Sequence, residues 1–85
     1  MNIVLHAHAI LARLRELAAG RIAVEPDALT LDARLADIGI DSFSLIELVF
    51  VAEEAFDIKI PMEGLHPVTV RDVVAVIERT IAEAR

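Results

Sequence analysis

Apolar residues recur at spacings of three and four in two parts of the chain, near its beginning and near its end. Such spacing places them along one side of an α-helix. The first pattern predicts a helix over residues 3–19, and Gly20 is a natural C-terminal stop for it. The last helix is predicted to begin at TVRD, a capping box in which Thr69 and Asp72 satisfy backbone N–H groups. The periodic positions are Ile3, Ala7, Ile10, Leu14 and Leu17 in the first helix and Val70, Val73, Val74, Ile77 and Ile81 in the last.

A further helix is predicted in the middle of the chain, from Asp41 or Ser42 to near Ala55. Asp41 is a suitable N-cap, because its carboxylate can accept from backbone N–H groups that have no partner inside the helix. Apolar residues expected to face the core here are Phe43, Ile46, Val49, Phe50 and Ala52, and all three phenylalanines of the chain, Phe43, Phe50 and Phe56, are expected to be core aromatics.

Two connections join these helices. Residues 21–40 contain Pro26 and Gly39, which break a long helix, but recurrent aliphatic residues indicate that this loop lies against the core, with a short turn near residues 33–37. The second connection ends in MEGLHP and leaves room for no more than one short helical turn. The pattern therefore predicts an all-α bundle, with three main helices, a short third helix or turn (a four-helix bundle in the first case), and a long loop between the first two helices.

Composition limits the alternatives. Eighty-five residues, 56% of them hydrophobic, are enough for one domain, residues 1–85, with one modest core. The absence of cysteine excludes disulfides and thiolate metal sites, and it is compatible with a reducing cytoplasm, where we expect a monomer. No metal site is expected either, since His6 and His8 are two residues apart and point to different sides of a helix. No apolar run approaches the ~20 residues of a membrane span, and the charges of the N-terminal segment follow its apolar stretch, unlike those of a signal peptide.

Negative charge is concentrated in one segment. The net charge is −6, and residues 41–63 contain six acidic residues against Lys59 alone, which gives −5 for this segment. A local acidic surface repels nucleic acid and anionic lipid, and it attracts basic surfaces of other proteins. Nucleic acid and membranes are therefore not expected as partners.

The segment that begins this acidic region carries the most specific motif. Residues 35–61 read LADIGIDSFSLIELVFVAEEAFDIKIP. An isolated Asp-Ser pair is a very weak signal, but here Gly39 precedes Asp41 by two residues, a Glu-Leu pair follows in the helix, and an Ile-Pro pair closes the segment. This combination resembles the central segment of acyl carrier proteins and their peptidyl carrier relatives. The resemblance extends to the whole chain in length, helix order and the Thr-Val start of the last helix.

The resemblance implies a non-enzymatic carrier. Ser42 would receive 4′-phosphopantetheine from coenzyme A through a phosphopantetheinyl transferase, and the thiol of this arm would hold the cargo as a thioester. A phosphate on the first turn of a helix meets unpaired N–H groups and the positive end of the helix dipole. Asp41 would cap the helix and help to hold the divalent metal used by the transferase.

The same resemblance assigns surfaces to partners and cargo. The partners would be the transferase, an acyl- or aminoacyl-loading ligase or synthetase, and downstream synthase or transferase enzymes. The residues of the implied docking face are Phe43, Glu47, Glu53, Glu54 and Asp57. A candidate cargo cavity would be lined by Ile46, Val49, Phe50 and Val74, whose first role is expected to be core packing.

Three departures from the family pattern favour a specialised carrier over a housekeeping role in fatty-acid synthesis. Phe43 replaces the usual leucine, Ser44 stands where an acidic residue is common, and the stretch MEGLHPV is short and weakly acidic. Fatty acyl, polyketide, hydroxyacyl, D-alanyl and aminoacyl groups all remain open as cargo, and with them fatty-acid, polyketide or nonribosomal peptide pathways.

Three other kinds of protein share part of this pattern. One alternative is an acidic helical adaptor that is never modified. Another is a carrier domain cut from a larger synthase, although the start at Met1 and the end at Arg85 favour a self-contained carrier. A hydrolase triad of Ser42, His66 and an aspartate is disfavoured, because it would need an oxyanion hole and a substrate cleft that a bundle of this size does not offer.

Overall fold

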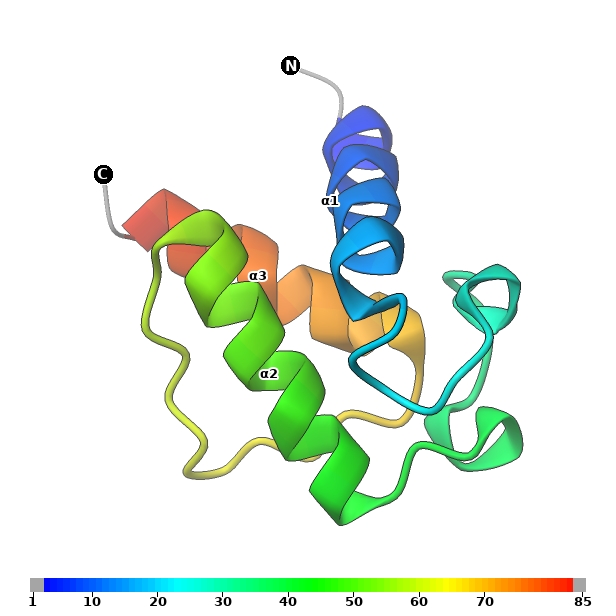
Figure 1. Cartoon of the computed structure of the whole chain (residues 1–85). Helices are drawn as coiled ribbons and strands as arrows, with labels where there is room; N and C mark the ends of the chain where they lie inside the picture. Colours follow the sequence, from blue (N-terminus) through cyan, green and yellow to red (C-terminus); the bar gives the residue numbers. More distant parts are fainter. Residues whose placement is uncertain (1–2, 84–85) are drawn as a thin grey trace.

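The computed structural model describes residues 3–83, in which α1 packs against both α2 and α3 (Figure 1). Met1 and Arg85, together with the side chain of Ile3, lie outside what it describes. The all-α fold and the long loop between the first two helices are confirmed. The elements are α1 (Ile3–Ala18), α2 (Ser42–Phe56) and α3 (Val70–Glu83), with two short 3-10 helices, η1 (Pro26–Ala28) and η2 (Leu35–Ile38), between α1 and α2.

The connection between α2 and α3 contains no helix, so the four-helix description is wrong. Within residues 57–69 the chain makes turns, one of them closed by a hydrogen bond from the Leu65 N–H to the Met62 carbonyl oxygen at 3.1 Å. Pro61 and Pro67 cannot donate backbone hydrogen bonds, and Gly64 takes a left-handed φ of 76°. These three residues leave too short an uninterrupted stretch for a stable helical turn.

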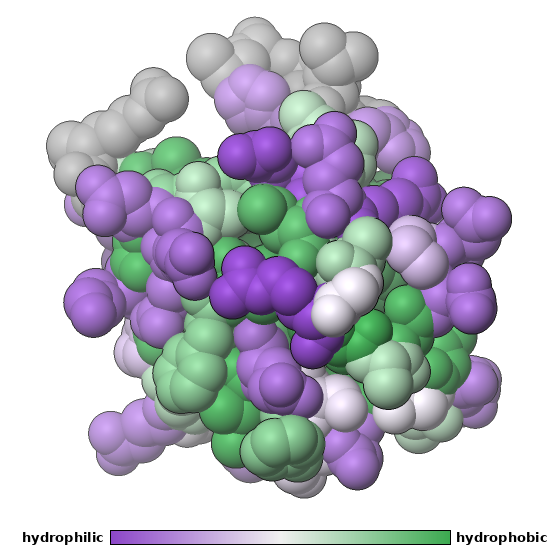
Figure 2. Space-filling model, viewed as in Figure 1, coloured by the Kyte–Doolittle hydropathy of each residue, from purple (hydrophilic) through white to green (hydrophobic). Residues whose placement is uncertain are grey.

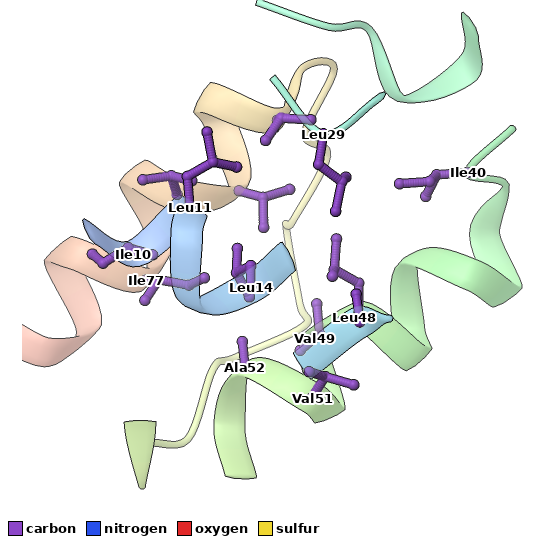
Figure 3. Close-up of a cluster of buried hydrophobic side chains, with 14 of the residues drawn as sticks. Ile10, Leu11, Leu14, Leu29, Ile40, Leu48, Val49, Val51, Ala52 and Ile77 are labelled. Atoms are coloured by element: carbon purple, nitrogen blue, oxygen red, sulfur yellow. The ribbon is translucent and has the colours of Figure 1, made fainter. Parts of the chain in front are cut away.

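The visible surface mixes polar and apolar side chains (Figure 2), whereas the core is wholly aliphatic (Figure 3). No polar or charged residue in the described part of the chain is buried. Leu14, Leu48 and Ile77, one from each helix, are almost completely withdrawn from water. Leu29 and Leu35 are also buried, which confirms that the long loop lies against the core.

The expected inward face of α2 is partly wrong. Phe43, Ile46 and Phe50 are 70%, 39% and 59% exposed, and Phe56 is only half-buried. The helix is apolar on nearly every side, so its own sequence does not indicate which side packs against α1 and α3. The side chains that α2 does bury are Leu48, Val49, Val51 and Ala52.

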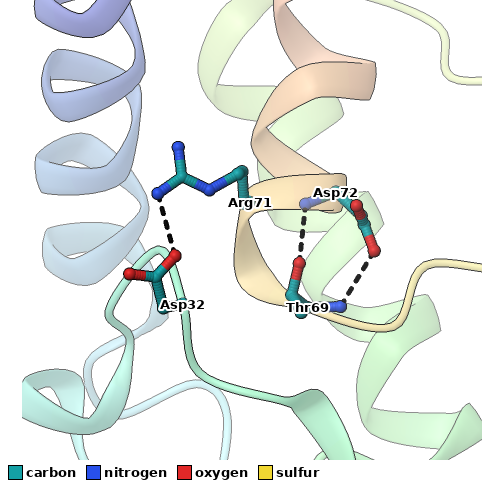
Figure 4. Close-up of polar contacts among 4 residues, drawn as sticks. All are labelled: Asp32, Thr69, Arg71 and Asp72. Atoms are coloured by element: carbon teal, nitrogen blue, oxygen red, sulfur yellow. Dashed lines mark hydrogen bonds and ion pairs between the residues drawn. The ribbon is translucent and has the colours of Figure 1, made fainter.

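The start of α3 is a capping box, as predicted (Figure 4). The Asp72 N–H donates to the Thr69 hydroxyl at 3.2 Å, and the Asp72 carboxylate accepts from the N–H groups of Val68 and Thr69 at 2.9 and 3.0 Å. These bonds hold the pKa of Asp72 below its usual value. The last turn of the loop is thereby fixed to the first turn of α3.

The long loop between α1 and α2 is hydrogen-bonded to the same region, the start of α3. The Leu35 N–H donates to the Val68 carbonyl oxygen at 2.9 Å, and the Val70 N–H donates to the Ala33 carbonyl oxygen at 3.0 Å. An ion pair of 2.9 Å between Arg71 and Asp32 lies beside them (Figure 4). Two loops that are distant in sequence are thus joined at the start of α3.

Candidate functional site

Ser42 is the first residue of α2, and its position is determined by the three residues before it. Gly39 ends η2 with a φ of 84°, a conformation that glycine adopts without steric cost. Ile40 is buried, and its N–H donates to the Leu35 carbonyl oxygen at 2.9 Å. Asp41 is extended, and the exposed Ser42 then enters the helix. The serine is therefore presented to solvent from a fixed backbone.

Asp41 caps α2, as the sequence predicted. Its Oδ1 accepts from the Ser44 N–H at 2.9 Å, and its carbonyl oxygen accepts from the Leu45 N–H at 2.9 Å. The hydrogen bond from Ser44 lowers the pKa of Asp41 from its ordinary value. The carboxylate is thus ionised at neutral pH and held close to Ser42.

This arrangement suits a phosphate ester on Ser42. The first N–H groups of an α-helix have no partner within the helix, and they lie at the positive end of its dipole. The Ser44 N–H is already bonded to Asp41, so an anion attached at the first residue would be stabilised by the other N–H groups of the first turn and by the helix dipole. Residues 3–83 offer no group of three or more His, Cys, Asp or Glu side chains that could hold a metal ion.

Comparison with known families identifies the fold that carries this serine. The family profile described as "Phosphopantetheine attachment site" matches residues 12–77, which include Ser42 and all of α2. The chain belongs to the acyl carrier protein family. Members of this family are carriers and not enzymes, and they hold 4′-phosphopantetheine covalently.

Curated relatives agree with this assignment over most of their length. The acyl carrier protein of Akkermansia muciniphila is 41% identical over 69 residues, 79% of this chain and 86% of the relative. That of Amoebophilus asiaticus is 43% identical over 65 residues, which are 74% of this chain and 81% of the relative. That of Campylobacter hominis is 35% identical over 71 residues, which are 81% of this chain and 90% of the relative.

The acidic residues expected to form one docking face of the carrier differ in their contacts. The Glu53 carboxylate accepts from the buried Ile60 N–H at 2.7 Å, so it holds the loop after α2. Glu54 is exposed and forms a 3.3 Å ion pair with Arg21. Asp57 ends α2 in the left-handed conformation, with a φ of 52°. The role of Glu53 was missed from the sequence, where it is indistinguishable from its neighbour.

Two aromatic and two acidic residues share one side of α2. At 100° per residue, Phe43, Glu47, Phe50 and Glu54 fall within about 60° of arc. Phe43 and Phe50 are mostly exposed, Glu47 is half-buried, and 73% of the Glu54 side chain is exposed. The carrier therefore presents an alternating aromatic and acidic row, which we call the α2 row, directly after Ser42.

The four residues expected to line a cargo cavity do not border one common hollow among those described within residues 3–83. Of these four residues, only Val49 borders an interior void, and this void has a volume of about 10 Å³. Ile46 and Phe50 are on the surface, because they lie on the side of α2 turned away from the core. Val74 is fully packed.

The remaining candidates of the sequence can also be placed. Ser42 and His66 line the same open groove, but no hydrogen bond joins them in the described structure. His6 and His8 are exposed on α1. None of the described helices combines the length and the apolar character needed to cross a membrane.

Proposed function

We propose that Ser42 is the residue to which this carrier attaches 4′-phosphopantetheine. The observation that carries the proposal is its position, exposed at the first residue of α2 and adjacent to a capped helix end. The Ser42 Oγ would form the new phosphodiester bond to the phosphorus that carries the pantetheine arm, while the pyrophosphate bond of coenzyme A breaks and adenosine 3′,5′-bisphosphate leaves. The proton of the Ser42 hydroxyl would pass to the transferase. The attached arm supplies a thiol, which the cysteine-free chain lacks.

Asp41 would act at two points in this reaction. Its Oδ1 orders the first turn of α2 through Ser44, so the Ser42 hydroxyl stays at the helix end. Its second carboxylate oxygen would offer a ligand to the divalent cation bound by the transferase and coenzyme A.

The α2 row would receive the partner enzymes. An enzyme that reaches Ser42 must cover the surface around it, and a typical interface extends over about 800 Å² on each partner. Phe43 and Phe50 are seven residues apart, about 10 Å along the helix, so both fall within such a footprint. We propose that partners contact these aromatic residues with apolar pockets and Glu47 and Glu54 with basic side chains, while Asp57 lies at the edge of this surface.

The proposed partners are a phosphopantetheinyl transferase, a loading ligase or synthetase, and downstream synthase or transferase enzymes. The exposed Phe43, at a position where the family usually has leucine, supports a specialised acyl carrier. We propose that it works as a monomer and as a single domain in the cytoplasm. Its cargo pathway, whether fatty-acid, polyketide or aminoacyl, would be identified by the enzymes that load it.

The attachment is tested by treating the apo carrier with coenzyme A, magnesium and a broad-specificity phosphopantetheinyl transferase. Intact-mass spectrometry should show the addition of one arm, and fragmentation of the proteolytic peptide should place it on Ser42. Addition at any other residue, or no addition at full transferase activity on a control carrier, would contradict the proposal.

A further inference from the structure

Arg21 brings a positive charge to the end of the α2 row that is far from Ser42. Its Nη2 lies 3.3 Å from the Glu54 Oε2, although the two residues are 33 positions apart in the chain. Arg21 belongs to the loop that leaves α1. Of the ion pairs within residues 3–83, this is the one that connects α2 to another segment.

The backbone that carries Arg21 is held in place. The Arg21 N–H donates to the Ala18 carbonyl oxygen at 3.0 Å, and the Ile22 N–H donates to the same oxygen at 3.1 Å. The Ile22 side chain is buried in the core. The Arg21 side chain therefore extends toward α2 from a fixed position, and the loop cannot move it away without disturbing the end of α1.

The two acidic residues of the α2 row are thus in different electrostatic surroundings. Glu47 takes part in no ion pair within residues 3–83, whereas Glu54 is paired with Arg21. Glu47 is about 8 Å from Ser42 along the helix, and Glu54 is about 18 Å from it. The uncompensated negative charge of the row therefore lies close to Ser42, and the charge at the far end is already neutralised.

A basic side chain of a partner cannot bind Glu54 without a cost. If it shares the carboxylate with Arg21, two like charges are brought together in the interface, which opposes docking. If it displaces Arg21, the existing ion pair must break, and exposed pairs of this kind change an equilibrium by up to about fivefold. In both cases Glu54 attracts a cation less strongly than an unpaired glutamate would.

We propose that Arg21 is a specificity-determining residue of this carrier. It disfavours enzymes that place a basic side chain opposite Glu54, and it favours enzymes whose basic side chain meets Glu47 beside Ser42. The inference rests on the proposed docking of partners at the α2 row. It adds the position along the row at which a partner must present its positive charge.

The first test measures kcat/KM for loading by a broad-specificity phosphopantetheinyl transferase at low ionic strength. Arg21→Ala should raise kcat/KM by about two- to fivefold, because it uncovers Glu54. The gain should lie in KM with kcat unchanged, since Arg21 is remote from the reacting serine. It should disappear at 1 M salt, where charges are screened within about 3 Å. Arg21→Lys keeps the positive charge and should show little gain.

Arg13→Ala is the matched control. The Arg13–Glu16 pair of α1 has an N–O distance of 3.2 Å, and its side chains are 52% and 68% exposed, similar to those of the Arg21–Glu54 pair. Its removal takes away the same charge and one exposed ion pair but uncovers no acid on α2. Arg13→Ala should therefore leave kcat/KM unchanged, and neither variant should lower Tm appreciably.

A double-mutant cycle places the effect on Glu54. In a Glu54→Ala background, Arg21→Ala should give less than half of the gain that it gives in the unsubstituted protein, because no acid is left to uncover. Glu47→Ala should lower kcat/KM more than Glu54→Ala does, since only Glu47 acts without an intramolecular competitor.

An unchanged or lowered kcat/KM in Arg21→Ala, an equal gain in Arg13→Ala, or the same gain in both backgrounds of the cycle would overturn the role of Arg21. These results would leave the proposed function intact. If Glu47→Ala and Glu54→Ala both had no effect, docking at the α2 row would be wrong instead. A carrier that gains no arm in the mass spectrum would refute the attachment itself.

Discussion

Substitution of the adjacent residues Glu53 and Glu54 by alanine should affect different properties of the protein, its stability in the first case and its reaction with partner enzymes in the second. Both were expected from the sequence to be docking acids, yet the Glu53 carboxylate accepts from the Ile60 N–H at 2.7 Å, whereas Glu54 makes a surface ion pair. Glu53→Ala should therefore reduce the free energy of unfolding, and Glu54→Ala should reduce the rate at which partner enzymes act on the carrier.

The magnitudes follow from the two environments. A hydrogen bond to a charged group contributes roughly 1.5–3 kcal/mol, and the half-buried position of Glu53 indicates the lower end, about 1.5 kcal/mol. The side chains of the Arg21–Glu54 pair are 48% and 73% exposed, 3.3 Å apart, and pairs of this kind contribute about 0–1 kcal/mol. Both residues lie near the C-terminus of α2, so helix-dipole effects nearly cancel in the comparison.

The assay is thermal and urea unfolding of the two variants beside the unsubstituted protein. For a domain of this size, 1.5 kcal/mol corresponds to a lowering of Tm by about 6–12 °C, expected for Glu53→Ala alone. Glu53→Gln retains an acceptor and should lose less. Equal changes in Tm for Glu53→Ala and Glu54→Ala would refute the assigned roles.

Three further outcomes are expected. Val74→Ala should cost about 2 kcal/mol in urea unfolding, whereas Ile46→Ala should cost less than about 1 kcal/mol, because only Val74 is buried; similar costs would show that the assigned core face of α2 is wrong. The folded-state pKa values of Asp41 and Asp72 are lowered, so their stabilisation is complete above the ordinary value of 3.8 and is lost as the pH falls below it. Asp41→Asn and Asp72→Asn should each flatten the fall in Tm measured between pH 5 and pH 2.5, and a fall as steep as in the unsubstituted protein would exclude the capping bonds as its cause. Phe50→Ala should lower kcat/KM for transferase loading by about tenfold, as for a central interface residue, with its Tm nearly unchanged; an unchanged kcat/KM would place docking outside the α2 row.

Much of the fold could be predicted from the sequence, because the patterns that determine these helices involve residues close together in the chain. The capping box of Thr69 and Asp72, the N-cap at Asp41 and the periodic faces of α1 and α3 each depend on residues within a few positions of one another. Each of these helices has one apolar side, so its orientation follows from its sequence. The resemblance of residues 35–61 likewise pointed to Ser42 without any tertiary information.

The sequence could not predict which face of α2 is buried, for a physical reason. With apolar residues on almost every side, either of two faces could have packed inward, and only contact with α1 and α3 decides between them. This choice buries Val49 and exposes Ile46 and Phe50. The open groove lined by Ser42 and His66 was missed for a similar reason, since its walls come from two segments that only the tertiary structure brings together.

The attachment residue can be tested most directly with two serines of the same helix turn. Ser42→Ala and Ser44→Ala are isosteric changes two residues apart, and each variant is incubated with coenzyme A, magnesium and the transferase before intact-mass spectrometry. The account predicts that the Ser44→Ala protein gains one arm, as the unsubstituted protein does, and that the folded Ser42→Ala protein gains none. An arm on the Ser42→Ala protein, or its loss from Ser44→Ala alone, would contradict the central claim.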